Sequence, residues 1–226
     1  MLLTSGVGVV FCGQLNIKKE TKVEQSVCRS VRLDSVDEKL ELLADRGIFI
    51  IGGEIDAGTV GGLFANLFTK LTPETKKPLW IMLDSPGGSI YQGLAVYDFL
   101  RAVALQGWEV NIISVGDVAS MAVCILQAGT KRYSFPNTQF TVHQASMSGE
   151  GEHQEVNKLL ESAEELKRLN KVVFKIVAER SGMDMKELLN LSRKTDYSIS
   201  ADKAKGFGPH GLIDEVVATF PFQING

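Results

Sequence analysis

Ser120 stands where an apolar run of the sequence gives way to a helical pattern. In VNIISVGDVASMAVCIL the run reaches Gly116, turns through small residues and re-emerges as a helical pattern that starts at the serine itself. A serine on such a turn projects its hydroxyl from a bend, and the free N–H groups of the new helix can receive a developing negative charge. The pattern suits the nucleophile of an acyl-transfer enzyme, and it equally suits a serine that only caps the helix.

A glycine pair follows a second apolar run. PLWIMLDSPGGSIYQGLAVYDFL predicts a strand through Leu83, a tight turn, and a helix with apolar residues at helical spacing. Paired glycines let the backbone adopt conformations closed to other residues, so the Gly88 N–H could point into a site. An ordinary strand-to-helix turn also explains Pro86-Gly87-Gly88.

One histidine is placed to act on such a serine. His143 directly ends the strand-like run from Gln139 to Val142, which follows a first short strand from Arg132 to Phe135. A histidine at a strand end can face a cleft or the core. His153 and His210 lie in polar surroundings, so His143 is the histidine expected beside a buried nucleophile.

The elements that must position these residues alternate along the chain. Three β-rich runs cover 47–53, 79–83 and 110–115, and the helices expected after the first two cover 59–71 and 92–103. Such alternation predicts βαβ units and a parallel sheet, in which functional groups gather at the carboxyl ends of the strands. Gly88 and Ser120 both lie just beyond such ends.

The pattern changes after His143. A small, polar stretch at 146–152 precedes a long helix within 153–182, which Gly182 ends. Its apolar stripe consists of Val156, Leu159, Leu160, Ala163, Leu166, Leu169, Val173, Ile176 and Val177. A helix of this length exceeds what a small sheet can cover, so we expect part of the stripe to project.

The sequence resembles the ClpP peptidases. DSPGGSIYQGLAVYD, GDVASMA, RYSFPNTQFTVHQ and KTDYSISADKAKGFGPHGLIDEV occur in the order and spacing of that family, over residues 31–219. The resemblance implies an α/β chain with the ClpP/crotonase-like fold and a protruding helical handle. Residues 1–30 are then an N-terminal extension or axial-loop region, and 31–226 form the peptidase domain. Within that domain the head comprises 31–145 and 183–226, and the handle 146–182.

The same resemblance assigns the catalytic roles. It places the nucleophile at Ser120, the general base at His143 and the third member of a Ser-His-Asp triad at Asp196. The imidazole takes the serine proton, and the carboxylate holds the imidazole tautomer and favours its charged form. The oxyanion amides fall at Gly88 and Met121, and the edge formed by Gly87 and Gly88 is expected to bind extended substrate.

Other carboxylates compete for these roles. Without the resemblance, Asp196 is explained as a loop or capping residue. Asp117 lies close to Ser120 in the sequence, but on the same turn it would point away from His143, so we expect it to cap the helix. Asp84 and Asp202 are expected to be turn and cap residues.

The chain departs from the usual ClpP pattern at several positions. Asp117-Val118-Ala119 precedes the serine in place of Gln-Ala-Ala, and Met121-Ala122 follows it in place of Met-Gly. Proline usually follows His-Gln, but here Ala145 follows Gln144. The loss of the proline ring is expected to loosen a rigid bend next to the base. Thr195 replaces an arginine that links the aspartate to ring contacts in many ClpP chains, so control by assembly is expected to differ.

Composition limits the partners. The chain has 226 residues, 44% hydrophobic and 23% charged, as one soluble globular domain requires. A net charge of −3 without a basic stripe argues against nucleic acid, and no stretch has the roughly 18 apolar residues needed to span a membrane. The cysteines Cys12, Cys28 and Cys124 have no metal-like spacing and fit free thiols in a reducing, cytoplasmic compartment.

We expect neither a cofactor nor a metal, and the sequence has no G-x-x-x-x-G-K-S/T loop for a nucleotide. The resemblance therefore implies a partner AAA+ unfoldase (a Clp ATPase) that supplies unfolded polypeptides. It also implies self-association into heptameric rings stacked in pairs, a tetradecamer interlocked by the handle helices, with the active sites inside a chamber.

Other functions fit parts of this pattern. A phage head-maturation-type peptidase shares the fold and the triad, and a non-catalytic Clp ring subunit shares the fold but usually lacks a triad member. A signal-peptide-peptidase-like enzyme would need a Ser-Lys dyad and a membrane anchor. A crotonase-type acyl-CoA enzyme has the fold and the oxyanion hole but needs no serine at the turn.

Overall fold

The computed structural model describes residues 36–72, 76–146, 155–193 and 196–223. Its strands are β1 (Ile48–Gly52), β2 (Leu79–Ser85), β3 (Val110–Ala119), β4 (Lys131–Ser134), β5 (Gln139–Val142), β6 (Tyr197–Ser200) and β7 (Glu215–Val216). Its helices are α1 (Val36–Asp45), α2 (Ala57–Lys70), α3 (Ile90–Leu105), α4 (Met121–Leu126), α5 (Val156–Ser181), α6 (Met185–Leu191) and α7 (Ala201–Lys205). The expected extension at 1–30 lies outside the described residues.

The central strands form the predicted parallel sheet, in the order β1-β2-β3-β4-β7. Buried aliphatic residues on β2 and β3 lie side by side, as in the pair Ile81 and Ile112. A parallel strand buried on both faces carries a nearly continuous apolar run, which is why 79–83 and 110–115 could be recognised as strands. The α/β class and the βαβ alternation are confirmed.

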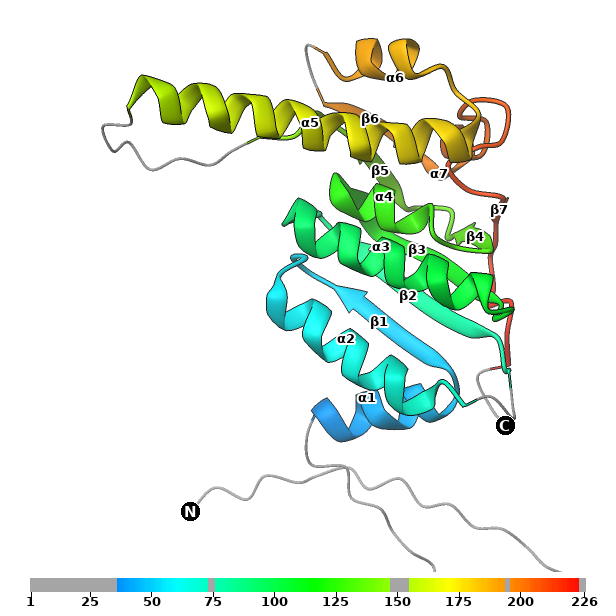
Figure 1. Ribbon diagram of the computed structural model, residues 1–226. Coiled ribbons are helices and arrows are strands. Elements are labelled where there is room, and N and C mark those ends of the chain that lie inside the picture. The colour runs from blue at the N-terminus through cyan, green and yellow to red at the C-terminus, as the bar shows by residue number, and fades with distance from the viewer. Residues whose placement is uncertain (1–35, 73–75, 147–154, 194–195, 224–226) are drawn as a thin grey trace, which may run out of the picture.

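The strand β3 changes partners along its length. Its first part pairs with β4, and its last three residues, Asp117 to Ala119, pair with β5. The strand β6 then adds to β5 in antiparallel orientation. In the upper part of the molecule in Figure 1, which also holds the helices α5 and α6, β5 and β6 therefore extend the sheet from the end of β3.

The helices α2 and α3 lie against the sheet on the side that faces the viewer in Figure 1. The short helix α4 is buried at all six positions and packs between α3, α5 and the end of β3. Burial of its apolar side chains stabilises the site region by about 25 cal/mol per Å² of apolar surface removed from water.

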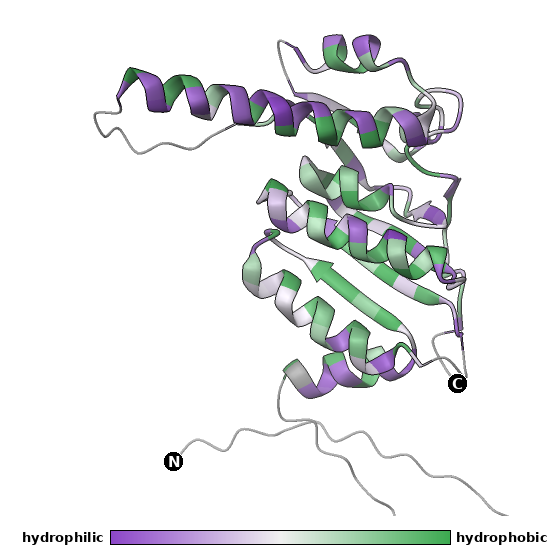
Figure 2. Cartoon of the chain, in the orientation of Figure 1, coloured by the Kyte–Doolittle hydropathy of each residue, from purple (hydrophilic) through white to green (hydrophobic). Residues whose placement is uncertain are grey.

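The helix α5 extends well beyond the other helices and the strands, as the predicted handle does (Figure 1). Its C-terminal half contributes buried residues such as Phe174 and Val177, whereas Val156, Leu159 and Leu160 near its start are exposed. Figure 2 shows hydrophobic and hydrophilic residues alternating along this projecting part. The helix ends at Gly182, which adopts the left-handed conformation predicted for a terminating glycine.

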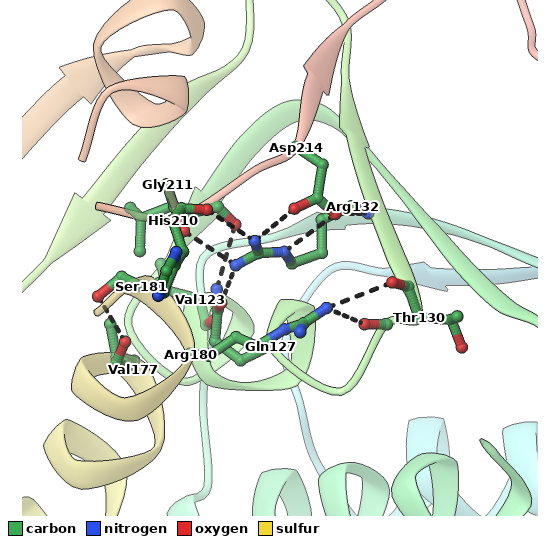
Figure 3. A network of polar contacts seen from close by, with 12 residues as sticks. Val123, Gln127, Thr130, Arg132, Val177, Arg180, Ser181, His210, Gly211 and Asp214 are labelled. Carbon is green, nitrogen blue, oxygen red and sulfur yellow. Dashed lines mark hydrogen bonds and ion pairs between the residues drawn. The ribbon is translucent and has the colours of Figure 1, made fainter. Parts of the chain in front are cut away.

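A buried arginine fastens the C-terminal segment to the sheet (Figure 3). The side chain of Arg132 on β4 is 2% exposed and lies 2.5 Å from the Asp214 carboxylate. It also donates to the Gln127 side chain and to the carbonyls of His210 and Gly211. Burial opposes ionisation of Asp214, but the Arg132 guanidinium outweighs it and holds the pKa of that carboxyl below its usual value.

Among the residues that the structure describes, no helix is long and apolar enough to cross a membrane. In the same part of the chain, no three His, Cys, Asp or Glu side chains gather as a metal ion requires.

Candidate active site

Ser120 occupies a strained position between β3 and α4. Its φ of 55° makes it the one non-glycine residue with a left-handed backbone within the described ranges. Such a conformation costs about 1–3 kcal/mol and persists only where the surroundings enforce it. Here the Ser120 N–H donates to Thr141 O at 2.8 Å, and Ser120 O accepts from Val123 N–H at 3.1 Å.

The serine does not act as a helix cap. Although it directly precedes α4, its side chain makes no capping hydrogen bond. The sequence allows two roles for this serine, helix cap and nucleophile. A cap would use the hydroxyl in a hydrogen bond to the helix, so a strained serine without that bond favours the nucleophile.

The expected turn between Gly116 and Ser120 is wrong. The strand β3 continues through Ala119, so Asp117 lies within a strand and does not cap α4. Asp84 likewise lies within β2 instead of a turn, and its carboxylate accepts the Asp117 N–H at 3.1 Å. This bond and the pairing with β5 carry the strand through residues that have turn character in the sequence. Asp202 lies in the first turn of α7, close to its expected place.

The Pro-Gly-Gly loop presses directly on the serine. Gly87 has a φ of 100°, and a Cβ there would lie 2.6 Å from Ser120 Cβ and 2.8 Å from Ala119 O. A side chain at this position has no room, so glycine is required for close approach and for its backbone conformation.

The backbone N–H and C=O of Gly88 do not take part in the bridge between Ile55 and Gly88. Ile55 N–H donates to Gly87 O at 2.8 Å, and Ile55 O accepts from Ser89 N–H at 2.9 Å, which makes a parallel bridge between Ile55 and Gly88. In such a bridge, the N–H and C=O of Gly88 itself face the opposite side. The Met121 N–H is also available, because the first N–H groups of a helix have no intrahelical acceptor.

Five of the six predicted site residues line one cavity of about 340 Å³: Gly87, Gly88, Ser120, Met121 and His143. Apolar side chains complete the walls, among them Val173, Phe174 and Val177 from α5. The cavity therefore lies between the carboxyl ends of the strands and the inner half of α5. Asp196 is not among its lining residues.

The imidazole of His143 contacts its own following residue. Nδ1 lies 2.7 Å from Gln144 O. A carbonyl oxygen only accepts hydrogen bonds, so this contact assigns a proton to Nδ1, and in the neutral imidazole Nε2 is then the unprotonated nitrogen. An unprotonated Nε2 is the form a general base needs.

His143 and Asp196 lie just beyond the paired end of β5 and β6. The antiparallel pairing of β5 and β6 ends with Val142 opposite Tyr197, so one further step of the same register places His143 opposite Asp196. Asp196 is exposed, and within the described residues no hydrogen bond joins Ser120, His143 and Asp196. Catalytic hydrogen bonds are often long or unformed without substrate, so the triad stays a prediction.

One residue of the site was missed in the sequence. Asn170 on α5 lines the cavity, and its Oδ1 accepts the Ala145 N–H at 2.9 Å. The available signal was its position, because Asn170 lies four residues after Leu166 and three before Val173, on the apolar stripe of the long helix. A polar residue on such a stripe indicates a specific partner.

Comparison with known proteins identifies the family. A profile described as Clp protease matches residues 31–220. The "ATP-dependent Clp protease proteolytic subunit 2" of Prochlorococcus marinus is 33% identical over 80% of this chain and 87% of its own length. The same-named protein of Chlamydia trachomatis is 34% identical over 82% of this chain and 87% of its own. The "ATP-dependent Clp protease proteolytic subunit" of Bdellovibrio bacteriovorus is 34% identical over 81% and 84%.

The chain therefore belongs to the Clp protease family, and the resemblance to ClpP peptidases found in the sequence is confirmed. Membership makes it a ClpP-type serine peptidase in general class, with the mixed α/β fold of that family.

Proposed function

We propose that this protein is a serine endopeptidase that hydrolyses unfolded polypeptides through Ser120, His143 and Asp196. The observation that carries the proposal is the strained Ser120, whose hydroxyl does not cap α4 and which shares one cavity with His143, Gly88 and Met121. A non-catalytic ring subunit would not need to maintain such strain.

The proposed reaction gives each of these groups one role. Nε2 of His143 accepts the proton of Ser120 as Oγ attacks a peptide carbonyl, and the N–H groups of Gly88 and Met121 hold the oxyanion. Asp196 stabilises the imidazolium as its charge develops. The imidazolium then protonates the leaving amine, and water repeats the sequence on the acyl-enzyme.

Substrate is proposed to bind as an extended strand. The free N–H and C=O of Gly88 form a short sheet edge beside the nucleophile, which can pair with a polypeptide backbone. The walls contributed by Val173, Phe174 and Val177 favour a moderately apolar side chain next to the cleaved bond.

We also propose that the active sites are enclosed in a chamber and that a partner ATPase delivers the substrate. The names of the relatives describe proteolytic subunits of an ATP-dependent protease, so we place this chain in stacked heptameric rings served by a Clp ATPase in the cytoplasm. The exposed apolar residues Val156, Leu159 and Leu160 on the projecting start of α5 suit contact with another copy. In this arrangement 31–145 and 183–226 are the head and 146–182 the handle.

Hydrolysis of a fluorogenic peptide, together with labelling by a serine-reactive fluorophosphonate, tests the proposal. Ser120→Ala is expected to abolish both, and Asp196→Asn to lower kcat by about 10³- to 10⁴-fold because the imidazole loses its orientation. Asp202→Asn, on the neighbouring helix α7, is the matched control with activity retained. Undiminished hydrolysis by Ser120→Ala would refute the nucleophile, and a wild-type protein inert to both probes would support the non-catalytic ring subunit.

A further inference from the structure

The peptide unit between Gln144 and Ala145 is held at both ends. Its C=O accepts from His143 Nδ1 at 2.7 Å, and its N–H donates to Asn170 Oδ1 at 2.9 Å. The described chain contains no cis peptide bond, and in a planar trans peptide the C=O and N–H point in opposite directions. Fixing the N–H therefore fixes the direction of the C=O, and with it the partner of the imidazole.

The support for this peptide comes from the packed inner part of α5. Asn170 is half-buried, directly follows the buried Leu169, and lies one turn before the buried Phe174. Its contact crosses from α5 to the segment after β5, because the two residues are 25 positions apart. By contrast, Gln144 itself is exposed, so the loop has little packing of its own.

We infer that Asn170 is a positioning residue of the reaction, acting on His143 through the Gln144–Ala145 peptide. The inference rests on the proposed function. Asn170 keeps the Gln144 carbonyl against Nδ1, which holds the proton there, so that in the neutral imidazole Nε2 is the nitrogen left to accept the Ser120 proton. In the structure the Gln144 carbonyl accepts the Nδ1 proton and so keeps the tautomer in the resting enzyme. In the proposed reaction the Asp196 carboxylate accepts that proton in its place as the imidazolium forms.

The residue at position 145 makes this arrangement possible. Proline, usual there in the ClpP pattern, has no N–H and supplies its own rigidity through its ring. Ala145 was expected to loosen the bend, but its N–H instead bonds to Asn170. A hydrogen bond from the handle therefore replaces the restraint of a proline ring, and it couples the base to α5.

A pair of near-isosteric variants tests the inference. Asn170→Leu removes the acceptor, whereas Asn170→Asp keeps an acceptor oxygen in the same place. One neutral hydrogen bond corresponds to roughly a 3- to 10-fold effect, so Asn170→Leu is expected to lower kcat by about that factor with KM unchanged. Asn170→Asp should retain most of kcat. Asn157→Leu, on the exposed start of α5, is the control for adding leucine to this helix.

Amide hydrogen exchange provides a readout that does not depend on activity. The Ala145 N–H should exchange faster in Asn170→Leu than in the wild type, because its acceptor is lost. Faster exchange with unchanged kcat would show a structural tie only and overturn the inference. Unchanged exchange would overturn it as well, because the contact would then be absent in solution.

A double-mutant cycle isolates the route of the effect. In an Ala145→Pro background the N–H no longer exists, so Asn170→Leu should change kcat by less than about twofold. A full effect of Asn170→Leu in that background would mean that Asn170 acts by another route. Failure of the proposed function is distinguishable, because it appears as hydrolysis or labelling that survives Ser120→Ala, whatever the state of Asn170.

Discussion

Replacing Gly87 by alanine tests whether the glycine loop sets the geometry of the nucleophile. A Cβ at Gly87 would lie 2.6 Å from Ser120 Cβ, 2.8 Å from Ala119 O and 3.0 Å from Met121 N. Two of these three atoms belong to the backbone of the strained turn, so a side-chain rotation cannot relieve the contact. Gly87 also has a φ of 100°, which costs an alanine about 1–3 kcal/mol.

The displacement determines the expected loss of activity. To move from 2.6 Å to an ordinary contact near 3.4 Å, the loop must retreat by roughly 0.8 Å, and a misplacement of about 1 Å can cost 10²-fold in rate. The adjacent Gly88 amide moves with the loop, and loss of one oxyanion donor costs about 10²- to 10³-fold. We therefore expect Gly87→Ala to lower kcat about 100-fold while the protein remains folded.

Peptide hydrolysis and thermal unfolding, measured side by side, check this prediction. Gly107→Ala is the matched control, because Gly107 has a φ of 88° and the atom nearest to a Cβ there is a side-chain end, Lys76 Nζ, at 3.2 Å. It has a comparable backbone cost without the clash at the serine, so its kcat should stay near the wild-type value. If Gly87→Ala hydrolyses peptide within threefold of wild type, the loop does not set the geometry of the site.

Two further predictions concern the buried groups. Asp214→Asn leaves Arg132 without its counter-charge; breaking a buried pair costs about 3–5 kcal/mol, which we reduce to about 2–3 kcal/mol because Asp214 is 39% exposed. Urea unfolding should show this loss near pH 7, against a small effect of Asp45→Asn in the exposed pair with Lys70. Because the pKa of Asp214 is lowered in the folded state, the wild-type advantage is complete above pH 3.8 and disappears as pH falls through the lowered pKa; an advantage that persists below it would contradict this assignment. Burial raises the pKa of the Cys124 thiol, so iodoacetamide at pH 8 should modify it only after unfolding, and peptide mass spectrometry of native protein showing alkylated Cys124 would refute this.

The sequence predicted the elements that carry their own local signal. The runs at 79–83 and 110–115 are apolar on both faces, and the long stripe ended by Gly182 has clear helical spacing. The structure contains these strands and this helix because the local hydrophobic pattern and the burial in the folded chain favour the same element.

The sequence could not predict features that depend on distant partners. Gly116 and Asp117 have turn character, yet β3 continues through them because Asp84 accepts the Asp117 N–H and β5 pairs with the strand end. Asp196 has no local mark of catalysis and was found only through the family resemblance. The contact between Ala145 and Asn170 joins a loop to a helix 25 residues away, which no local pattern encodes.

The hydrogen bond from Ser120 N–H to Thr141 O ties the backbone of the proposed nucleophile to β5, the strand that precedes His143. It belongs to the seam between β3 and β5, so the alcohol and the imidazole are carried by adjoining strands of one framework. No such bond ties Asp196 to Ser120 or His143 within the described chain. Asp196 is exposed and directly precedes β6, which pairs with β5 alone. A contact made by another molecule on β6 would therefore displace the Asp196 carboxylate before it displaced Ser120 or His143. Such a displacement would lower the activity while the other two groups keep their positions.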